Sequence, residues 1–181
     1  MANVIKLRKG LDVNLKGKAA KEEFQVKKPA VYALMPDDFT GMKPKVVVKE
    51  NDVVKVGDAL FVDKNHPEIK FVSPVSGRVT MVERGDRRKV LSVRVEADAE
   101  LQYVYFGKKR ARQMPAQEVK ALLLESGLFA FFKQRPYDVT ANPTDTPKAI
   151  FVSAFNSMPL AADFEYVLRG READFQAGLD A

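Results

Sequence analysis

The sequence contains no cysteine, and its single histidine is His66. Without thiols, these 181 residues cannot form a disulfide, a thiolate zinc site, a cysteine-ligated iron–sulfur cluster or a thiol nucleophile. One histidine also cannot supply a histidine-based metal cluster. We therefore predict no catalytic residue and no metal ligand in this chain. The lack of cysteine is typical of proteins in a reducing compartment.

Long apolar runs are also missing. The first residues, Met1 to Lys6, lack the apolar core of a signal peptide. No window is long and apolar enough to cross a bilayer as a helix. We expect a chain that folds in water and has no transmembrane segment, so that any link to a membrane runs through partners or a peripheral surface.

Charges of both signs are abundant, with 30 Lys and Arg against 24 Asp and Glu. The positive residues are mostly interleaved with acids, which favours a solvated surface and argues against nucleic-acid binding. Two runs are denser, Arg84 to Lys89 and Lys108 to Arg112. For Arg87-Arg88-Lys89, two interpretations stay open: docking on a neighbouring protein of a complex or on lipid headgroups, or a hairpin tip kept soluble by its charge.

Residues 43–97 show the pattern of a small all-β unit. Short β-branched runs alternate with turn residues such as Gly57-Asp58 and the stretch from Ser73 to Gly77. Many short strands at regular spacing predict a β sandwich or barrel. The expected strands cover 45–49, 53–56, 59–62, 68–72, 78–82 and 90–96.

The pattern changes after residue 107. A helix is predicted from Gln113 to Gly127, with Pro115 at its start and glycine at its end. Residues 149–154 have the apolar run of a buried strand in a parallel sheet, and helices are expected at 165–168 and 172–179. One strand cannot make a sheet, so we expect the beginning of an α/β domain and a chain that is part of a longer protein.

The spacing within residues 48–82 resembles the barrel-sandwich hybrid of lipoyl and biotinyl domains. The resemblance rests on Gly57-Asp58-Ala59-Leu60 and on the turn around Pro74. In carrier domains the modified lysine stands at a tight hairpin tip. Here the tip falls near His66, Lys64 is displaced toward the preceding strand, and Pro67 follows. We therefore expect the barrel without its swinging arm.

A finer resemblance covers nearly the whole chain. Separated segments follow, in order, those of the NqrA family, which belongs to the sodium-translocating NADH:quinone reductase, and the set is more specific than any member. The segments are 5–12, 39–44, 61–64, 71–74, 84–93, 123–128, 135–137, 149–154, Asn156 and 159–163.

This resemblance implies an α+β protein with two parts. Residues 1–107 would hold the β-rich barrel-sandwich hybrid (core 43–97) behind an N-terminal extension. Residues 108–181 would hold a helical segment and the incomplete start of an α/β domain resembling the flavin-binding subunit of complex I. No glycine-rich phosphate loop is visible here, so flavin or NADH binding does not carry over.

The implied function is that of a peripheral subunit on the cytoplasmic face of the bacterial inner membrane. The complex would oxidise NADH, reduce ubiquinone or menaquinone and export sodium. Other subunits would carry NADH, the flavins and the iron–sulfur centres, and this chain would hold no covalent cofactor and lie near quinone. Two alternatives stay open: the related RnfC subunit of the Rnf electron-transport complex, and a non-enzymatic biotin- or lipoyl-like carrier. The isolated chain is expected to be inactive.

Two segments are candidates for quinone proximity. Flat aromatic rings can hold a quinone head, and a cation can favour an oxygen that gains negative charge. The competing interpretation is that the phenylalanines fill the interface between the two parts, and that the segment around Met35 is a loop entering the barrel. The candidates are Phe129, Phe131, Phe132, Lys133, Arg135 and Tyr137 in one segment, and Met35, Phe39 and Met42 in the other.

Two weaker candidates complete the set. Asp37 and Asp38 are a conceivable cation site, although adjacent side chains converge only in a turn, and a solvated loop is the simpler interpretation. His66 is a conceivable proton donor, against the simpler interpretation of an exposed residue near a hairpin tip.

Overall fold

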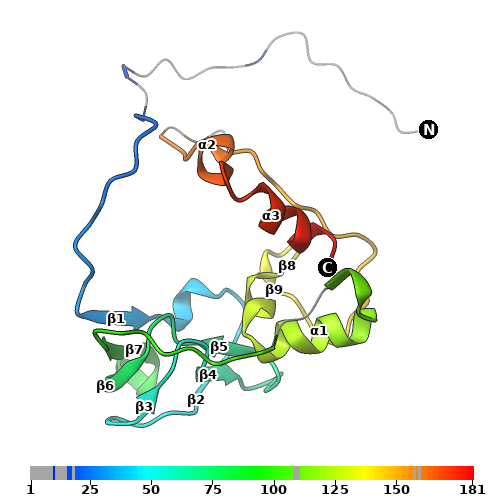
Figure 1. Cartoon of the computed structure of the whole chain (residues 1–181). Helices are drawn as coiled ribbons and strands as arrows, with labels where there is room; N and C mark the ends of the chain where they lie inside the picture. Colours follow the sequence, from blue (N-terminus) through cyan, green and yellow to red (C-terminus); the bar gives the residue numbers. More distant parts are fainter. Residues whose placement is uncertain (1–9, 11–15, 18, 108–110, 157, 159) are drawn as a thin grey trace.

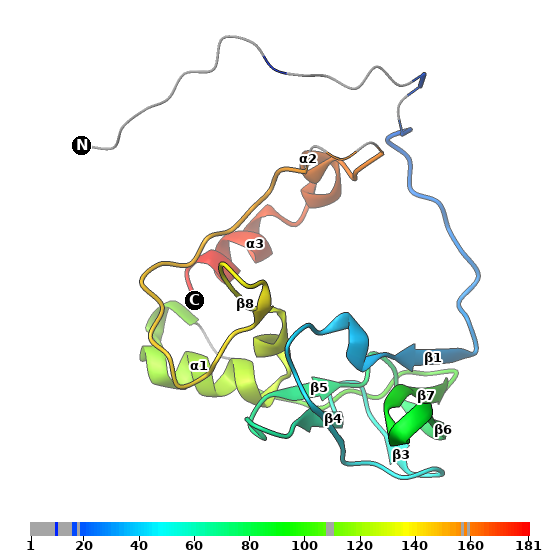
Figure 2. The same ribbon diagram turned by 180° about the vertical axis from the view of Figure 1, so that it is seen from behind.

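A computed structural model describes residues 10, 16–17, 19–107, 111–156, 158 and 160–181. The strands β1 to β7 form a unit at one end of the molecule, and α1, the β8–β9 ribbon, α3 and α2 extend away from it (Figure 1). Seen from behind, the segment before β1 runs along the outside of the molecule from the neighbourhood of α2 to β1 (Figure 2).

The β unit consists of two antiparallel sheets. The first has the order β1-β7-β6-β3 and the second the order β2-β4-β5. Their alternating apolar residues meet in one core, as the β-branched runs predict. The strands are β1 (Val31–Leu34), β2 (Pro44–Val46), β3 (Val53–Val54), β4 (Ala59–Asp63), β5 (Lys70–Val72), β6 (Gly77–Arg84) and β7 (Val90–Ala97).

All six predicted strands of this region are present, and β1 was not predicted. β1 pairs with β7, and its burial alternates because only Tyr32 and Leu34 turn toward the core. A short strand with one solvated face gives a weak sequence signal. The short helices η1 (Pro36–Asp38) and η2 (Asp86–Arg88) interrupt the strand order.

The core lies between the two sheets. Leu60, Phe61, Phe71, Val79 and Val93 are almost fully buried. At roughly 25 cal/mol per Å² of buried apolar surface, such side chains contribute about 1.5–3 kcal/mol each before conformational entropy is counted. This core is the main source of stability in the β unit.

The second part is mostly helical and small. It contains η3 (Ala111–Gln113), α1 (Ala116–Glu125), η4 (Leu128–Phe131), the ribbon of β8 (Lys133–Gln134) and β9 (Val139–Thr140), α2 (Phe164–Leu168) and α3 (Glu172–Leu179). The predicted helices at 113–127, 165–168 and 172–179 are therefore confirmed. None of the helices in the described ranges has the length and apolar character needed to cross a bilayer.

The predicted buried strand at 149–154 is wrong for this structure. Residues 149–154 have no regular secondary structure, and Ile150, Phe151 and Val152 are 64%, 90% and 57% exposed. The segment runs past α3 toward α2 (Figure 1). A strand needs a neighbour for its backbone hydrogen bonds, and the described residues supply none beside this segment. The apolar composition was identified correctly, but composition alone does not pair a strand.

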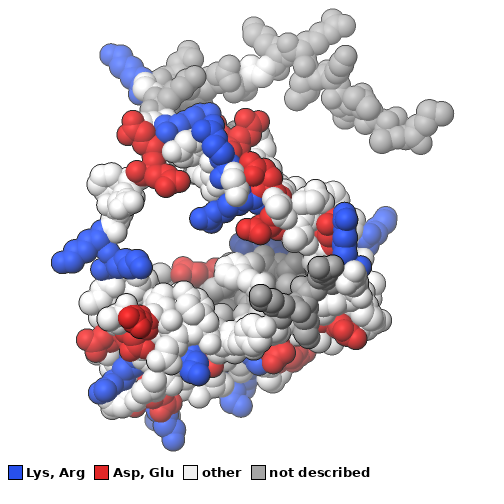
Figure 3. Space-filling view, in the orientation of Figure 1, with Lys and Arg blue, Asp and Glu red and all other residues white. Residues whose placement is uncertain are grey.

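Charges are distributed as their order in the sequence predicts. On the face drawn in Figure 3, Lys and Arg alternate with Asp and Glu over the β unit. The Arg94–Glu83 pair is one example, with Nη2 and Oε2 2.7 Å apart and Ser92 donating to the same oxygen. These two hydrogen bonds, Ser92 first, lower the pKa of the Glu83 carboxyl below its ordinary value.

The two parts join where α1 ends. Gly127 has φ +77, the left-handed conformation of a helix C-terminus, and lies against Val72 of β5. A Cβ on Gly127 would stand 2.6 Å from Val72 Cγ1, so only glycine fits without movement. Behind this junction Phe129 and Ala130 of η4 enter the core.

Gly127→Ala is therefore expected to lower the free energy of unfolding by about 2–4 kcal/mol, because backbone strain and a steric clash add. Gly170→Ala is the matched control: its φ is +79, but no atom lies within 4 Å of the new Cβ. The control should lose only about 1 kcal/mol. Chemical denaturation measures both, and adding Val72→Ala should recover part of the Gly127→Ala loss. Equal losses for the two glycines would contradict this junction.

Candidate functional site

The two segments predicted to lie near quinone meet in the folded chain. The Phe39 ring lies 6.2 Å from the Phe131 ring, edge to face at 65°. Next to them, the Thr140 amide donates to the Thr40 carbonyl at 3.0 Å. Gly41 lies against Val139, which a Cβ on Gly41 would meet at 2.7 Å. The loop after η1 and the β8–β9 ribbon thus form one surface, which no feature of either segment alone predicted.

Phe39 connects this surface to the core. Its ring lies 4.6 Å from that of Phe71 and 6.4 Å from that of Phe61, both edge to face. Phe61 and Phe71 are buried and stacked at 5.0 Å. Phe131, at the other end of the row, is 70% exposed. The aromatic row therefore runs from the middle of the β unit to solvent.

Other predicted aromatic residues divide by exposure. Phe129 is 9% exposed and belongs to the core, and it stacks on half-buried Phe132 at 5.8 Å. Tyr137 is 77% exposed between β8 and β9. The interface interpretation therefore fits Phe129, whereas Phe131 and Tyr137 present their rings to solvent.

The two predicted cations share one carboxylate. Lys133 Nζ and Arg135 Nη1 each lie 3.3 Å from an oxygen of Asp138. The hydrogen bond from Lys133 is the largest effect that lowers the pKa of the Asp138 carboxyl, and Arg135 acts in the same direction. Sequence reasoning missed Asp138. All three side chains are near solvent, where ion pairs are weak and exchange partners readily.

The methionines of the first segment separate. Met42 is half-buried and packs on the core. Met35 is 45% exposed and precedes η1. Met35 and Met42 thus flank the loop that carries Phe39.

The carrier-type lysine is not at a tight turn. Lys64 follows β4 directly in a connection spanning 64–69, and its backbone amide donates to the Lys43 carbonyl at 2.7 Å. Buried Asp63 accepts from the amides of Lys43 and Asn65. The Asp-Lys pair therefore anchors a loop, which is a structural role.

Two weaker candidates have simple local partners. His66 Nδ1 lies 3.7 Å from Glu68 Oε1 on the surface of the same connection. Asp37 Oδ2 lies 2.6 Å from Lys89 Nζ. Within the described part of the chain, no three His, Cys, Asp or Glu side chains gather as metal ligands.

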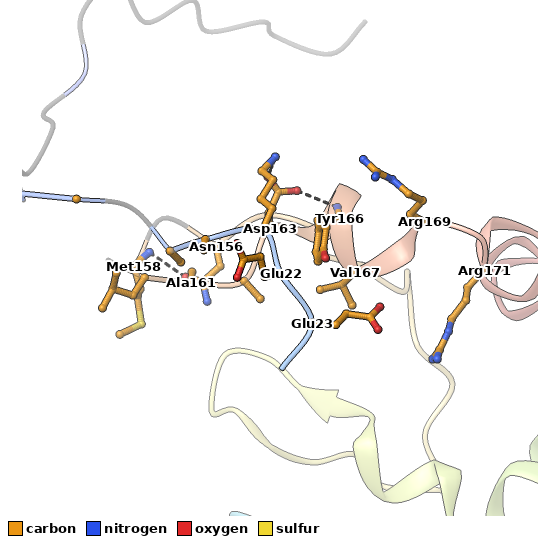
Figure 4. A pocket seen from close by; sticks show the side chains of 16 residues that line it. Glu22, Glu23, Asn156, Met158, Ala161, Asp163, Tyr166, Val167, Arg169 and Arg171 are labelled. Carbon is orange, nitrogen blue, oxygen red and sulfur yellow. Dashed lines mark hydrogen bonds and ion pairs between the residues drawn. The ribbon is translucent and has the colours of Figure 1, made fainter. Parts of the chain in front are cut away.

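A hollow of about 880 Å³ lies between residues 17–23 and the segment from Asn156 to Arg171 (Figure 4). Lys21 Nζ lies 2.6 Å from Asp163 Oδ2, and Asp163 caps α2 by accepting from the Tyr166 amide. The Lys21 hydrogen bond is the main cause that lowers the pKa of the Asp163 carboxyl. Arg169 and Arg171 point in opposite directions (Figure 4). The hollow thus joins the N-terminal segment to α2 without converging groups on one ligand.

Comparison with known proteins matches both parts of the chain. Residues 5–98 match the family model described as the NqrA N-terminal barrel-sandwich hybrid domain. Residues 114–181 match the one described as the NqrA second alpha/beta domain. The barrel predicted from residues 48–82 and the α/β character predicted for the second part are therefore confirmed.

Individual relatives agree. The chain is 38% identical over 180 residues to the NqrA subunit of the Na(+)-translocating NADH-quinone reductase from Serratia proteamaculans (strain 568). It is 37% identical to the protein of the same name from Yersinia pseudotuberculosis serotype O:1b (strain IP 31758) and 36% identical to that from Actinobacillus pleuropneumoniae serotype 5b (strain L20). Each match covers 97% of this chain and 40% of the relative's length.

Because the two family models together cover most of the chain in the expected order, this chain belongs to the NqrA family of the Na(+)-translocating NADH-quinone reductase.

Proposed function

We propose that this chain serves in a peripheral subunit of a sodium-translocating NADH:quinone reductase, supporting electron transfer from NADH to ubiquinone or menaquinone. The observation that carries the proposal is the match of both domains, in order, to relatives that bear this name. The chain spans 40% of the length of those relatives, so the activity belongs to the larger assembly.

The chemistry itself is assigned to other subunits. With no cysteine in the sequence, this chain supplies no thiolate for an iron–sulfur cluster. NADH, the flavins and the iron–sulfur centres are proposed to lie on partners, and this protein on the cytoplasmic face of the bacterial inner membrane. The isolated chain is expected not to turn over NADH.

Within that assembly we place quinone beside the surface formed by the loop after η1 and the β8–β9 ribbon. Phe131 and Tyr137 offer exposed rings on which a flat quinone head can stack. Lys133 and Arg135 stand next to them and are held only by exposed pairs with Asp138. A reduced quinone oxygen that gains negative charge would compete with Asp138 for these cations.

The first prediction concerns the assembly. The tagged full-length protein, purified from detergent-solubilised native membranes, is expected to bring down flavoprotein and membrane subunits with NADH:quinone reductase activity that sodium stimulates. Partner identification and a sodium titration measure this. Recovery of the protein alone, or with ferredoxin-coupled partners, would overturn the proposed function.

The second prediction concerns quinone. In the purified reductase, Phe131→Leu and Tyr137→Leu are each expected to raise the KM for quinone about fivefold, because a lost aromatic contact is worth roughly 1 kcal/mol. NADH oxidation by an artificial acceptor should be unchanged. Tyr105→Leu is the matched control, since Tyr105 is 78% exposed and lies outside this surface. A rise in KM as large in the control would contradict the placement of quinone.

A further inference from the structure

The turn between β6 and β7 has an unusual composition for its backbone. Lys89 N donates to Asp86 O at 3.1 Å, which closes a four-residue β-turn, and Gly85 N donates to Lys89 O at 2.8 Å. The two central residues have positive φ, +53 for Arg87 and +62 for Arg88. With ψ +29 at Arg87, this is the geometry of a type I′ turn.

Type I′ turns strongly favour Asn-Gly or Gly-Gly at the central positions, because a side chain with a Cβ is strained at positive φ. Here both positions carry arginine. The hairpin therefore keeps two strained residues where two relaxed ones would close the same turn. Strain of this kind points to a function that requires the side chains themselves.

Arg87 and Arg88 are also presented outward. Both are exposed, and neither has an ion-pair partner within the described ranges of the chain. Their neighbours are already engaged: Lys89 pairs with Asp37 at 2.6 Å, and Arg84 Nη1 donates to the Arg88 carbonyl at 3.3 Å. Figure 2 shows η2 on the near side of the β unit, apart from α1 and the β8–β9 ribbon.

The preference for a rigid arginine pair distinguishes between partners. Attraction to an anionic lipid surface depends on the number of charges, so a flexible lysine-rich loop would serve equally well. A guanidinium held in one orientation is suited to bidentate hydrogen bonds with a carboxylate. A pre-organised side chain also loses less conformational entropy on binding.

Resting on the proposed function, we propose that Arg87 and Arg88 at the β6–β7 turn are a docking point for a carboxylate-bearing, acidic surface of a partner protein in the reductase. This contact is separate from the quinone-proximal surface. It fixes the β unit to the rest of the complex through charge-assisted hydrogen bonds.

The test replaces the pair by the sequence that the turn prefers. In the full-length protein, Arg87→Asn with Arg88→Gly is expected to leave the melting temperature unchanged or to raise it by up to about 4 °C. The same variant should bind at least tenfold more weakly to detergent-solubilised reductase from a strain that lacks this protein. A merely structural turn would show the stabilisation without the loss of binding.

Two further variants sharpen the result. Lys27→Asn with Lys28→Gly removes two adjacent exposed charges elsewhere and should bind like the wild type. Arg87→Lys with Arg88→Lys keeps the charge but not the planar guanidinium, and should bind severalfold more weakly than the wild type. Sedimentation with phosphatidylglycerol vesicles tests the lipid alternative, and no dependence on Arg87 and Arg88 is expected.

The outcomes separate cleanly. If the wild-type protein binds the stripped reductase and the Asn-Gly variant binds equally well, the docking point is wrong and the proposed function stands. If the Lys-Lys variant binds like the wild type and vesicle binding requires the arginines, the partner is lipid and the proposed protein contact is overturned. If the wild-type protein itself fails to bind, the proposed function is overturned as well.

Discussion

The contact of Phe39 with Phe71 is the interaction on which the arrangement of this chain depends. Phe71 stacks on Phe61 in the middle of the β unit, and Phe39 covers that pair edge to face at 4.6 Å. On its other side Phe39 meets Phe131 of the helical part. One ring thus belongs to the buried core and to the junction between two domains, and aromatic pairs of this kind add about 0.5–1.5 kcal/mol beyond their buried area.

The same junction explains why a structural and a functional interpretation of the aromatic residues hold together. Phe129 is buried by the junction, while Phe131 and Tyr137 remain exposed on the adjoining ribbon. The core fixes the exposed rings in place, as a binding surface for a flat ligand requires, because rigid support reduces the entropy lost on binding. The cations beside them are restrained by Asp138 without being buried.

Much of the β unit could be predicted from the sequence because its strands alternate at period two between turn residues. The helices of the second part could be predicted from local signals such as Gly127. The meeting of Phe39 with Phe131, and the sharing of Asp138 by Lys133 and Arg135, could not, because they depend on chain packing between segments distant in sequence or on the bend of a ribbon. The strand expected at 149–154 failed for a related reason, since apolar composition does not specify the neighbouring strand that a sheet requires.

Photolabelling in the intact reductase tests most directly whether the two segments form one surface beside quinone. A photoreactive quinone, competed by excess natural quinone, is mapped by mass spectrometry of this protein's peptides. Competed labels are expected on both the 35–42 and the 128–137 segments, because Phe39 and Phe131 lie side by side. Labels confined to other subunits, or to other segments of this chain such as 17–23, would contradict the placement of quinone at this surface.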